Sequence, residues 1–292
     1  MSFVVGPLTV RTPASSANLG PGFDALGLAL TLHDELTAEV LPDEGVLEIE
    51  ITGEGERELP RTSEHLVVRA MNAAFDLLGE RPPGLRLHCH NVIPHGRGLG
   101  SSSAAIVGGI VLARALADGA DRLDDQALYQ LATDLEGHPD NVAAALFGGL
   151  TIAWIEGAAA AVQRLDVTTA VTVFVPPEAV STEKARGLLP ESVLHVDAAA
   201  NAGRAALLVA ALTVAPERLI SATEDRLHQS YRAVVMPDSY NLLRTLRVDG
   251  IPTVISGAGP CVLSFARGID DAAPDGWVVH HLEVDPLGAR LV

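Results

Sequence analysis

The sequence predicts an α+β fold of one large domain or two smaller ones, and two observations support this prediction. Segments with strand patterning come in runs near both ends of the chain and do not alternate one by one with helices, as they would in a doubly wound sheet. The 292 residues are 48% apolar, which is ample for one large domain or two smaller ones. The stretch GAAAAVQ at 157–163 indicates a boundary between two α+β halves, 1–158 and 159–292, although a surface hairpin would have the same composition.

The first half is expected to hold these elements in order. Alternating apolar residues predict strands in FVVGPLTVRTP, ELTAEVL and VLEIEITG, and turn residues separate the last two. HLVVRAMNAAFDLLG has helical spacing and ends on Gly79, a residue suited to a C-cap. GLRLHCHNVIP predicts a strand that stops at Pro94. Helices are then expected from about Ser102 to Leu116, in DDQALYQLATDLEG and, over a short length, in PDNVAAALFGG.

The second half mixes the two patterns. LTIAWIEG and AVTVFVPP predict strands, and AANAGRAALLVAALTV and PERLISATEDRLHQ predict helices. Late strands are expected in PTVISGAG, CVLSFA and WVVHHLEV. No internal repeat of fixed period is present in the sequence.

Charge and rare residue types narrow the function. A net charge of −17 disfavours nucleic acids and anionic membranes as partners, because binding them needs clustered Lys and Arg. No segment approaches the roughly 20 uninterrupted apolar residues of a membrane helix. Cys89 and Cys261 are the only cysteines, so a reducing cytoplasm is the natural setting. Lys184 is the only lysine and lies in neither a P-loop nor a protein-kinase motif, which excludes both families.

The segment PHGRGLGSSS, 94–103, is the first candidate site. Its glycines would let an anion approach the backbone, and a helix beginning at the serines would direct free N–H groups and its dipole at that anion. Serine hydroxyls could cap the helix, bind phosphate oxygens or help to hold Mg²⁺. A glycine-rich turn capped by serine would explain the same residues without a ligand.

The segment PASSANLGPGFDALGLAL places polar residues around two glycines. Gly20, Gly22 and Ala25 satisfy a dinucleotide fingerprint of the G-x-G-x-x-A type. Pro13 and a polar run separate these glycines from the preceding strand, which argues against a dinucleotide. Asn18 and Asp24 are therefore either site residues or ordinary turn residues.

Two further segments could line the same site. In EGHPDN, Glu136 is a hard oxygen ligand suited to Mg²⁺, with His138 and Asn141 beside it. Asp140 and Asn141 could instead merely cap a helix. ISGAGPCVLSF predicts a glycine turn between strands, which could close over a nucleotide if it lay beside the first loop.

Arginine and histidine supply other candidates. Arg186 in VSTEKAR and Arg232 in DRLHQSYR can grip a carboxylate with two parallel hydrogen bonds, although an arginine is more often a surface ion-pair partner. His88 and His90 share one face of a strand, but no third metal ligand stands at a telling spacing, which favours a structural role. The sequence has no G-x-S-x-G elbow, so no hydrolase nucleophile is indicated.

In their order, PASSANLGPGFDALGLAL, IPHGRGLGSSSAA, DLEGHPDNVAAALFGG, VSTEKARGLLP, LHQSYR and ISGAGPCVLSF closely resemble the homoserine kinase family of the GHMP kinase superfamily. The resemblance implies a two-domain GHMP kinase fold, with an N-terminal half like ribosomal protein S5 domain 2 and a ferredoxin-like C-terminal half. It implies transfer of the ATP γ-phosphoryl group to the side-chain hydroxyl of L-homoserine, for threonine biosynthesis in the cytoplasm. ATP and Mg²⁺ are then the cofactors, no Walker lysine is needed, and a homodimer is compatible with the family.

The resemblance also assigns roles to residues. The phosphate loop would consist of Pro94, Gly96, Arg97, Gly98, Leu99, Gly100, Ser101, Ser102 and Ser103. Ser102 and Glu136 would hold Mg²⁺. Asp24 would meet the substrate ammonium group and Asn18 the reacting hydroxyl. Arg186 and Arg232 would bind the substrate carboxylate, and the pocket would be shaped by Thr182, His138 and Asn141.

Asn141 differs from the residue found in several members of the superfamily, and the chain departs from the family pattern at His65 and in the segment EGHPDN, which is shorter than in relatives with extra residues after the glutamate. Asn141 stands where several GHMP kinases have an aspartate that can act as a base. Phosphoryl transfer depends mainly on positioning and charge stabilisation, so the expected catalytic residues are Asn18, Glu136 and Asn141, without a strong base. His65 stands where an asparagine is expected near the adenine pocket.

Two alternatives stay open at this point. Another small-molecule GHMP kinase, acting on mevalonate or a sugar, would leave Asp24, Arg186 and Arg232 as unexplained buried charge. A catalytically silent sensor with the same fold would be expected to lose its magnesium or phosphate-loop groups, and Ser102, Glu136 and the glycines are all present.

Overall fold

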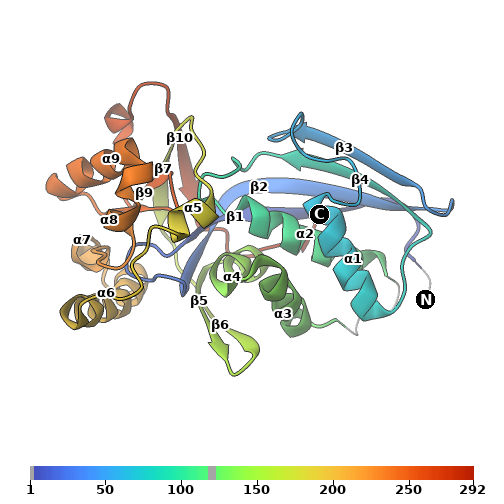
Figure 1. The fold of residues 1–292 in the computed structure, drawn as a ribbon, viewed down its shortest axis with the longest axis horizontal. Coiled ribbons are helices and arrows are strands. Elements are labelled where there is room, and N and C mark those ends of the chain that lie inside the picture. Colours follow the sequence, from blue (N-terminus) through green and yellow to red (C-terminus); the bar gives the residue numbers. More distant parts are fainter. Residues whose placement is uncertain (1–2, 118–122) are drawn as a thin grey trace.

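The computed structural model describes residues 3–117 and 123–292, which form two sheets with helices packed against them (Figure 1). The first sheet has the order β11-β1-β2-β4-β3, and β5 and β6 continue from β2. Its strands are β1 (Leu8–Ala17), β2 (Leu26–Leu41), β3 (Leu47–Gly53), β4 (Gly84–Asn91), β5 (Leu150–Glu156), β6 (Ala159–Leu165) and β11 (Arg290–Leu291). Among the described strands only β3 and β4 pair in parallel, so the runs of strands in the sequence become antiparallel neighbours.

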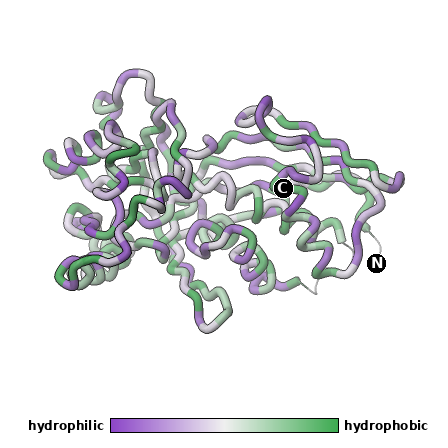
Figure 2. The backbone as a smooth tube through the Cα atoms, viewed as in Figure 1, coloured by the Kyte–Doolittle hydropathy of each residue, from purple (hydrophilic) through white to green (hydrophobic). Residues whose placement is uncertain are grey.

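Four helices cover one face of the first sheet. They are α1 (Leu66–Leu78), α2 (Ser101–Leu116), α3 (Asp125–Glu136) and α4 (Pro139–Phe147). Along the long strands the residues alternate between hydrophilic and hydrophobic (Figure 2), as expected for a sheet with one face on a core and the other in solvent. Gly108 and Gly109 have no side chain, so α2 can lie close to the elements packed against it. A Cβ on Gly109, for example, would come within 2.7 Å of the Val67 carbonyl oxygen in α1.

The second sheet has the order β10-β7-β9-β8. It consists of β7 (Ala170–Val175), β8 (Thr253–Ile255), β9 (Val262–Ser264) and β10 (Val278–Glu283). Its helices are α5 (Thr182–Arg186), α6 (His195–Thr213), α7 (Leu219–Ala222), α8 (Gln229–Arg232) and α9 (Pro237–Val248), with 3-10 turns at Pro216–Arg218, Ala233–Val235 and Asp270–Ala272. The first sheet with α1 to α4 is called the first unit, and the second sheet with α5 to α9 is called the second unit. Figure 1 shows α5 near the junction of the two sheets, so its residues lie close to both units.

Most predicted elements are confirmed, but two predictions need correction and two elements were not foreseen. PERLISATEDRLHQ is not one helix: a 3-10 turn and α7 end at Ala222, and α8 begins only at Gln229. The buried Asp225 carboxylate accepts the backbone N–H groups of Leu227, His228 and Gln229, which competes with helical pairing. β1 continues through Pro13 to Ala17 with a register shift after Pro13, so the proline does not separate the strand from the glycines. β6 and α9 were not expected.

The expected division after residue 158 falls inside the β5–β6 hairpin. Glu156 pairs with Ala159, and both strands belong to the first sheet. GAAAAVQ is therefore a surface hairpin, the alternative that its composition allowed. The last strand, β11, returns to pair with β1. A two-domain division remains a proposal, and the strand pairing favours a boundary after Leu165.

One helix in the described ranges, α6, has the length and mean hydropathy of a membrane span, although Asp197 and Arg204 interrupt its apolar residues. A single helix of this kind is weak evidence for a membrane. Two of its charged residues make ion pairs: Asp197 with Arg226 at 3.2 Å, and Arg204 with Glu224 at 3.1 Å. These surface ion pairs are suited to an aqueous environment.

Candidate active site

A cavity of about 340 Å³ lies between the two units. Its lining includes every candidate residue that the sequence assigned to phosphates, magnesium or substrate, with the single exception of Ser103. The first unit supplies the glycine loop, the turn at 18–24 and the segment 136–141. The second unit supplies Thr182 and Arg186 from α5, Arg232 from α8, and the turn at Gly257 and Ala258. The motifs are far apart in the chain, and the fold gathers them at one place.

The glycine loop has a backbone that only glycine adopts readily. Gly96, Gly98 and Gly100 have φ angles of 64°, 77° and 69°. A Cβ on Gly98 would lie 2.2 Å from the Ser256 carbonyl oxygen, and one on Gly100 would lie 2.0 Å from the Ser15 hydroxyl oxygen. α2 begins at Ser101 with Gly100 as its N-cap and no side-chain cap, so the alternative of a serine cap is wrong. The first N–H groups of α2 therefore lie at the cavity, where they suit an anion.

The second glycine turn supports the first. The Ser256 hydroxyl donates a hydrogen bond to the Gly98 carbonyl oxygen at 2.6 Å, and the Cys261 N–H donates to the Arg97 carbonyl oxygen at 3.1 Å. The Arg97 guanidinium donates to the carbonyl oxygens of Pro176 and His95 at 2.9 and 2.8 Å. These contacts fix the shape of the loop, and they hold the Arg97 guanidinium between backbone carbonyl oxygens of two separate segments.

Ser102, Ser103 and Glu136 form a compact group of oxygen atoms at the start of α2. The hydroxyls of Ser102 and Ser103 donate to the same carboxylate oxygen, Oε1 of Glu136, at 2.6 and 2.7 Å. Ser103 is fully buried, whereas Ser102 and Glu136 line the cavity. Hydroxyl and carboxylate oxygens beside a phosphate-binding helix end are a donor set suited to Mg²⁺.

The turn at 18–24 carries the candidate substrate residues Asn18 and Asp24, with positive φ angles of 68° and 53°. Such angles in non-glycine residues are costly and often mark functional sites. The Asn18 amide donates to the Gly257 carbonyl oxygen at 2.8 Å and accepts the Asp24 N–H at 2.9 Å. Asp24 forms two parallel hydrogen bonds with Arg186, both at 2.9 Å, and this bonding raises the pKa of Arg186. Asp24, which is predicted to bind the substrate ammonium group, is thus paired with Arg186, which is predicted to bind the substrate carboxylate.

Arg232 differs from Arg186 because it is buried and has no acidic partner. It is 2% exposed, and the described residues place no carboxylate within 4 Å of its guanidinium. Its contacts are uncharged: the His228 ring nitrogen at 3.0 Å, and the carbonyl oxygens of Ala185 and Gly257 at 3.3 and 3.4 Å. Burial, and next the neighbouring Arg186, lower its pKa. A buried cation that lines a cavity without a carboxylate in direct contact provides a site for an anionic group.

The segment 136–141 brings a carboxylate that the sequence analysis treated only as a cap. Asp140 is 2% exposed and lines the cavity. Its Oδ1 accepts the Asn141 N–H at 2.8 Å and lies 3.0 Å from His138 Nδ1. This hydrogen bond is the main cause that raises the pKa of His138. Asn141 in turn accepts the Ser15 hydroxyl at 2.9 Å through its side-chain oxygen.

Sequence reasoning also missed two rings. Phe23 stacks on the His228 ring with 5.1 Å between centroids, and the guanidinium carbons of Arg186 and Arg232 lie 5.8 and 5.5 Å from the centre of the Phe23 ring. Phe23 lies next to Asp24 in a quoted motif, but no spacing rule distinguishes it from a core residue. His228 lies in LHQSYR, four residues before Arg232, and this helical spacing was the available signal.

The remaining candidate histidines differ in their surroundings: His65 lines the cavity, whereas His88 and His90 lie on a strand of the first sheet. His65 lines the cavity, is 3% exposed, and has no hydrogen-bond partner on either ring nitrogen among the described residues. Burial lowers its pKa, so the neutral imidazole is favoured. His90 contacts Thr52 Oγ1 at 3.1 Å, and within residues 3–117 and 123–292 no group of three or more metal-binding side chains is found. A structural role for His88 and His90 stays a prediction.

Known proteins resemble this chain in sequence and in fold. The sequence model of the family described as GHMP kinases N terminal domain matches residues 65–149. A homoserine kinase of Streptomyces avermitilis is 57% identical over 302 residues, covering 100% of this chain and 97% of the relative. A homoserine kinase of Leifsonia xyli subsp. xyli is 52% identical, with 97% of this chain and 91% of the relative covered.

Solved structures agree with these relatives. A homoserine kinase from Cytophaga hutchinsonii has a TM-score of 0.84 at 26% identity, covering 98% of this chain and 97% of that chain. The L. major mevalonate kinase has a TM-score of 0.68 at 14% identity, covering 98% of each chain, and shares the fold alone. The predicted GHMP kinase fold is confirmed.

Proposed function

The chain belongs to the homoserine kinase family of GHMP kinases, and from this premise we propose that it transfers the γ-phosphoryl group of ATP to the side-chain hydroxyl of L-homoserine. The products are O-phospho-L-homoserine and ADP. The observation that carries the proposal is Arg232, a buried guanidinium that lines the cavity without an acidic partner. The carboxylate of an amino acid is the anion that this position suits, because a guanidinium can bind it with two parallel hydrogen bonds.

The other charges of the cavity fit the rest of an amino-acid substrate. Asp24 supplies the anion for the ammonium group, and Arg186 supplies a second cation for the carboxylate. When the substrate binds, their mutual ion pair would be exchanged for contacts with the two ends of the zwitterion. Asn18 would then meet the hydroxyl at the centre of the site, and the pocket would be closed by Thr182, His138 and Asn141. Mevalonate has a carboxylate but no ammonium group and would leave Asp24 without its substrate partner, and a neutral sugar would leave Arg232 without a partner as well.

The phosphates of ATP belong at the glycine loop. Free N–H groups at the start of α2 and the positive end of its dipole would bind the β- and γ-phosphates, with the loop glycines allowing close approach. Ser102 and Glu136 would hold Mg²⁺, and the hydrogen bond from the buried Ser103 hydroxyl would keep the Glu136 carboxylate in place. The ion would neutralise phosphate charge when bound.

The reaction itself forms one bond and breaks one. The substrate hydroxyl oxygen bonds to the γ-phosphorus while the bond between this phosphorus and the β,γ-bridging oxygen breaks, and ADP leaves with the bonding electrons. Asn141 has no useful basicity. Asp140 is held by two hydrogen bonds on one oxygen, one of them from His138. We therefore propose that positioning and charge stabilisation carry the step and that the hydroxyl proton leaves late, to the phosphate or to solvent.

The cellular setting follows the same proposal. The product would enter threonine biosynthesis in the cytoplasm. A homodimer is compatible with the family. Neither the sites above nor the net charge of −17 gives a place for a nucleic acid or an anionic membrane.

A coupled ADP-release assay with ATP and Mg²⁺ tests the function. L-homoserine should be turned over, whereas D-homoserine, L-serine, mevalonate and galactose should react at least about tenfold more slowly. Arg232→Ala should raise KM for L-homoserine by about tenfold or more, because a charge-assisted pair is lost, and it should leave KM for ATP nearly unchanged. Turnover of mevalonate or a sugar in place of L-homoserine would overturn the proposed substrate, and ATP binding without any turnover would favour a sensor.

A further inference from the structure

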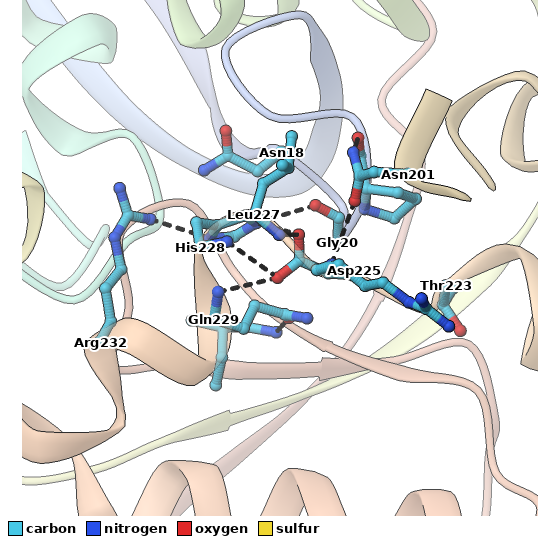
Figure 3. Close-up of polar contacts among 12 residues, drawn as sticks. Asn18, Gly20, Asn201, Thr223, Asp225, Leu227, His228, Gln229 and Arg232 are labelled. Atoms are coloured by element: carbon cyan, nitrogen blue, oxygen red, sulfur yellow. Dashed lines mark hydrogen bonds and ion pairs between the residues drawn. The ribbon is translucent and has the colours of Figure 1, made fainter. Parts of the chain in front are cut away.

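His228 is fully buried between the turn at Gly20 and the guanidinium of Arg232 (Figure 3). It is the residue that precedes α8, and Arg232 is the last residue of this helix. Nε2 of His228 lies 2.8 Å from the Gly20 carbonyl oxygen, and Nδ1 lies 3.0 Å from Nη1 of Arg232. Each ring nitrogen therefore has one defined partner.

These two partners determine where the proton of the imidazole lies. A carbonyl oxygen can only accept, so Nε2 must carry the hydrogen that reaches Gly20. A guanidinium can only donate, so Nδ1 must present its lone pair to Arg232. Burial lowers the pKa of His228, in agreement with a neutral ring. Protonation of Nδ1 would place two N–H groups against each other.

None of the groups that contact Arg232 near His228 neutralises its positive charge. The side chain of Asp225 is fully buried, and its Oδ1 lies 3.7 Å from Nε2 of His228. Its carboxylate already accepts three backbone N–H groups. The contacts of Arg232 itself are an imidazole nitrogen and two carbonyl oxygens, all uncharged. A carboxylate in the place of His228 would hold Arg232 equally well but would compete with an incoming anion.

We propose that His228 is a positioning residue for substrate recognition: as the neutral Nε2–H tautomer, it orients Arg232 through Nδ1 without neutralising it. The inference rests on the proposed function, because the anion for Arg232 is taken to be the substrate carboxylate. Phe23, stacked on the imidazole, fixes the plane of the ring and thereby the direction of the lone pair. The turn at Gly20 is coupled to Arg232 through this ring.

Kinetic coupling between His228 and the substrate carboxylate tests the proposal. The full-length chain and its His228→Leu and His228→Asn variants are compared on L-homoserine and L-homoserine amide, which lacks the carboxylate charge. His228→Leu should lower kcat/KM for L-homoserine by about tenfold, chiefly through KM, and should affect the amide far less. The preference for L-homoserine over the amide should shrink accordingly. His228→Asn retains a neutral acceptor near Nδ1 and should restore most of this preference.

Asn201→Ala is the matched control for disturbance of the same turn. Asn201 is buried and donates to the Pro21 carbonyl oxygen at 2.8 Å, one residue beyond Gly20, and it has no contact with Arg232 among the described residues. This variant should leave the preference for L-homoserine over the amide unchanged. An unchanged preference in His228→Leu, or an equal loss in Asn201→Ala, would overturn the proposal.

A second measurement does not depend on the substrate or on the folding of a variant. ¹⁵N NMR of the histidine rings in the unmodified chain at pH 7 should find His228 protonated at Nε2 and unprotonated at Nδ1. A proton on Nδ1 would overturn the inference even if L-homoserine is the substrate. If L-homoserine is not turned over while the Nε2–H tautomer is found, the proposed function fails and the orientation of Arg232 by His228 stands.

Discussion

Asp24 and Arg186 show how two side chains can serve binding more than stability. Their side chains are 38% and 44% exposed, so their ion pair is well screened by water despite its bidentate geometry. Such surface pairs contribute about 0–1 kcal/mol to the free energy of unfolding. The positive φ of Asp24 costs conformational energy in addition. The arrangement is therefore hard to explain by folding and easy to explain by a zwitterionic substrate.

Asp24→Asn should separate these two roles. We expect the melting temperature to change by less than about 4 °C, because at most about 1 kcal/mol is lost from a chain of this size. KM for L-homoserine should rise about tenfold or more, because the ammonium group loses its carboxylate. Thermal unfolding and steady-state kinetics measure the two effects. Arg86→Gln is the control, since Arg86 is 51% exposed and paired with two glutamates on the first sheet, away from the cavity. A large loss of stability in Asp24→Asn with normal KM would contradict this division.

At the scale of elements, local patterns located the helices and strands better than they located the breaks between them. Amphipathic spacing is a property of neighbouring residues, so α1, α3 and β4 could be predicted from the chain alone. The helix expected at 216–229 is interrupted because the Asp225 carboxylate accepts backbone N–H groups, and the burial of this side chain could not be read from the local sequence. Gly100 was not recognised as the N-cap of α2, because the constraint on it comes from Ser15 in a different element.

The glycine loop yields a prediction that isolates tertiary contact from backbone strain. Gly98 and Gly45 have nearly the same φ, 77° and 75°, but an added Cβ would meet the Ser256 carbonyl oxygen at 2.2 Å in the first case and open space in the second. Gly45→Ala should cost only about 1 kcal/mol, the strain of a left-handed conformation. Gly98→Ala should cost more and should weaken binding of ADP and ATP by at least about tenfold, because the loop must move away from the second glycine turn. Urea unfolding and nucleotide calorimetry would show this difference, and equal behaviour of the two variants would refute it.

At the scale of the whole molecule, the cavity is made by contacts that no local pattern contains. Asn18 bonds to Gly257, 239 residues away, and Ser15 bonds to Asn141, 126 residues away. The sequence motifs identified nearly all of these residues by their order and type, through the resemblance to a known family. The ion pair between Asp24 and Arg186 forms only when the two units meet, and the burial of Arg232, Asp140 and His65 depends on packing between segments that are far apart in the chain. Charge partners therefore could not be predicted even where the residues could.

The connection between the first sheet and the glycine loop predicts a specific dependence of stability on pH. Asp34 in β2 is 4% exposed, and one carboxylate oxygen accepts the N–H groups of Val92 and Ile93 at 2.6 and 2.9 Å, immediately before the loop. Burial raises the pKa of Asp34 from 3.8 to about 6, and the two backbone hydrogen bonds oppose this shift only in part. Between these two values the folded chain holds a proton that the unfolded chain releases. The contribution of Asp34 to stability is thus fully present below about pH 4 and is lost as the pH rises through about 6.

Asp34→Asn should remove this dependence while keeping an oxygen that accepts both N–H groups. Relative to the variant, the unmodified chain should lose up to about 3 kcal/mol of unfolding free energy between pH 4 and pH 7, the value that corresponds to a shift of about two pKa units. Urea unfolding at half-unit steps of pH would give the difference between the two chains, in which all other titrating groups cancel. A difference that stays constant with pH would show that Asp34 is ionised in the folded chain throughout this range. The loop would then be anchored by a carboxylate whose charge the two N–H groups stabilise fully, despite its burial.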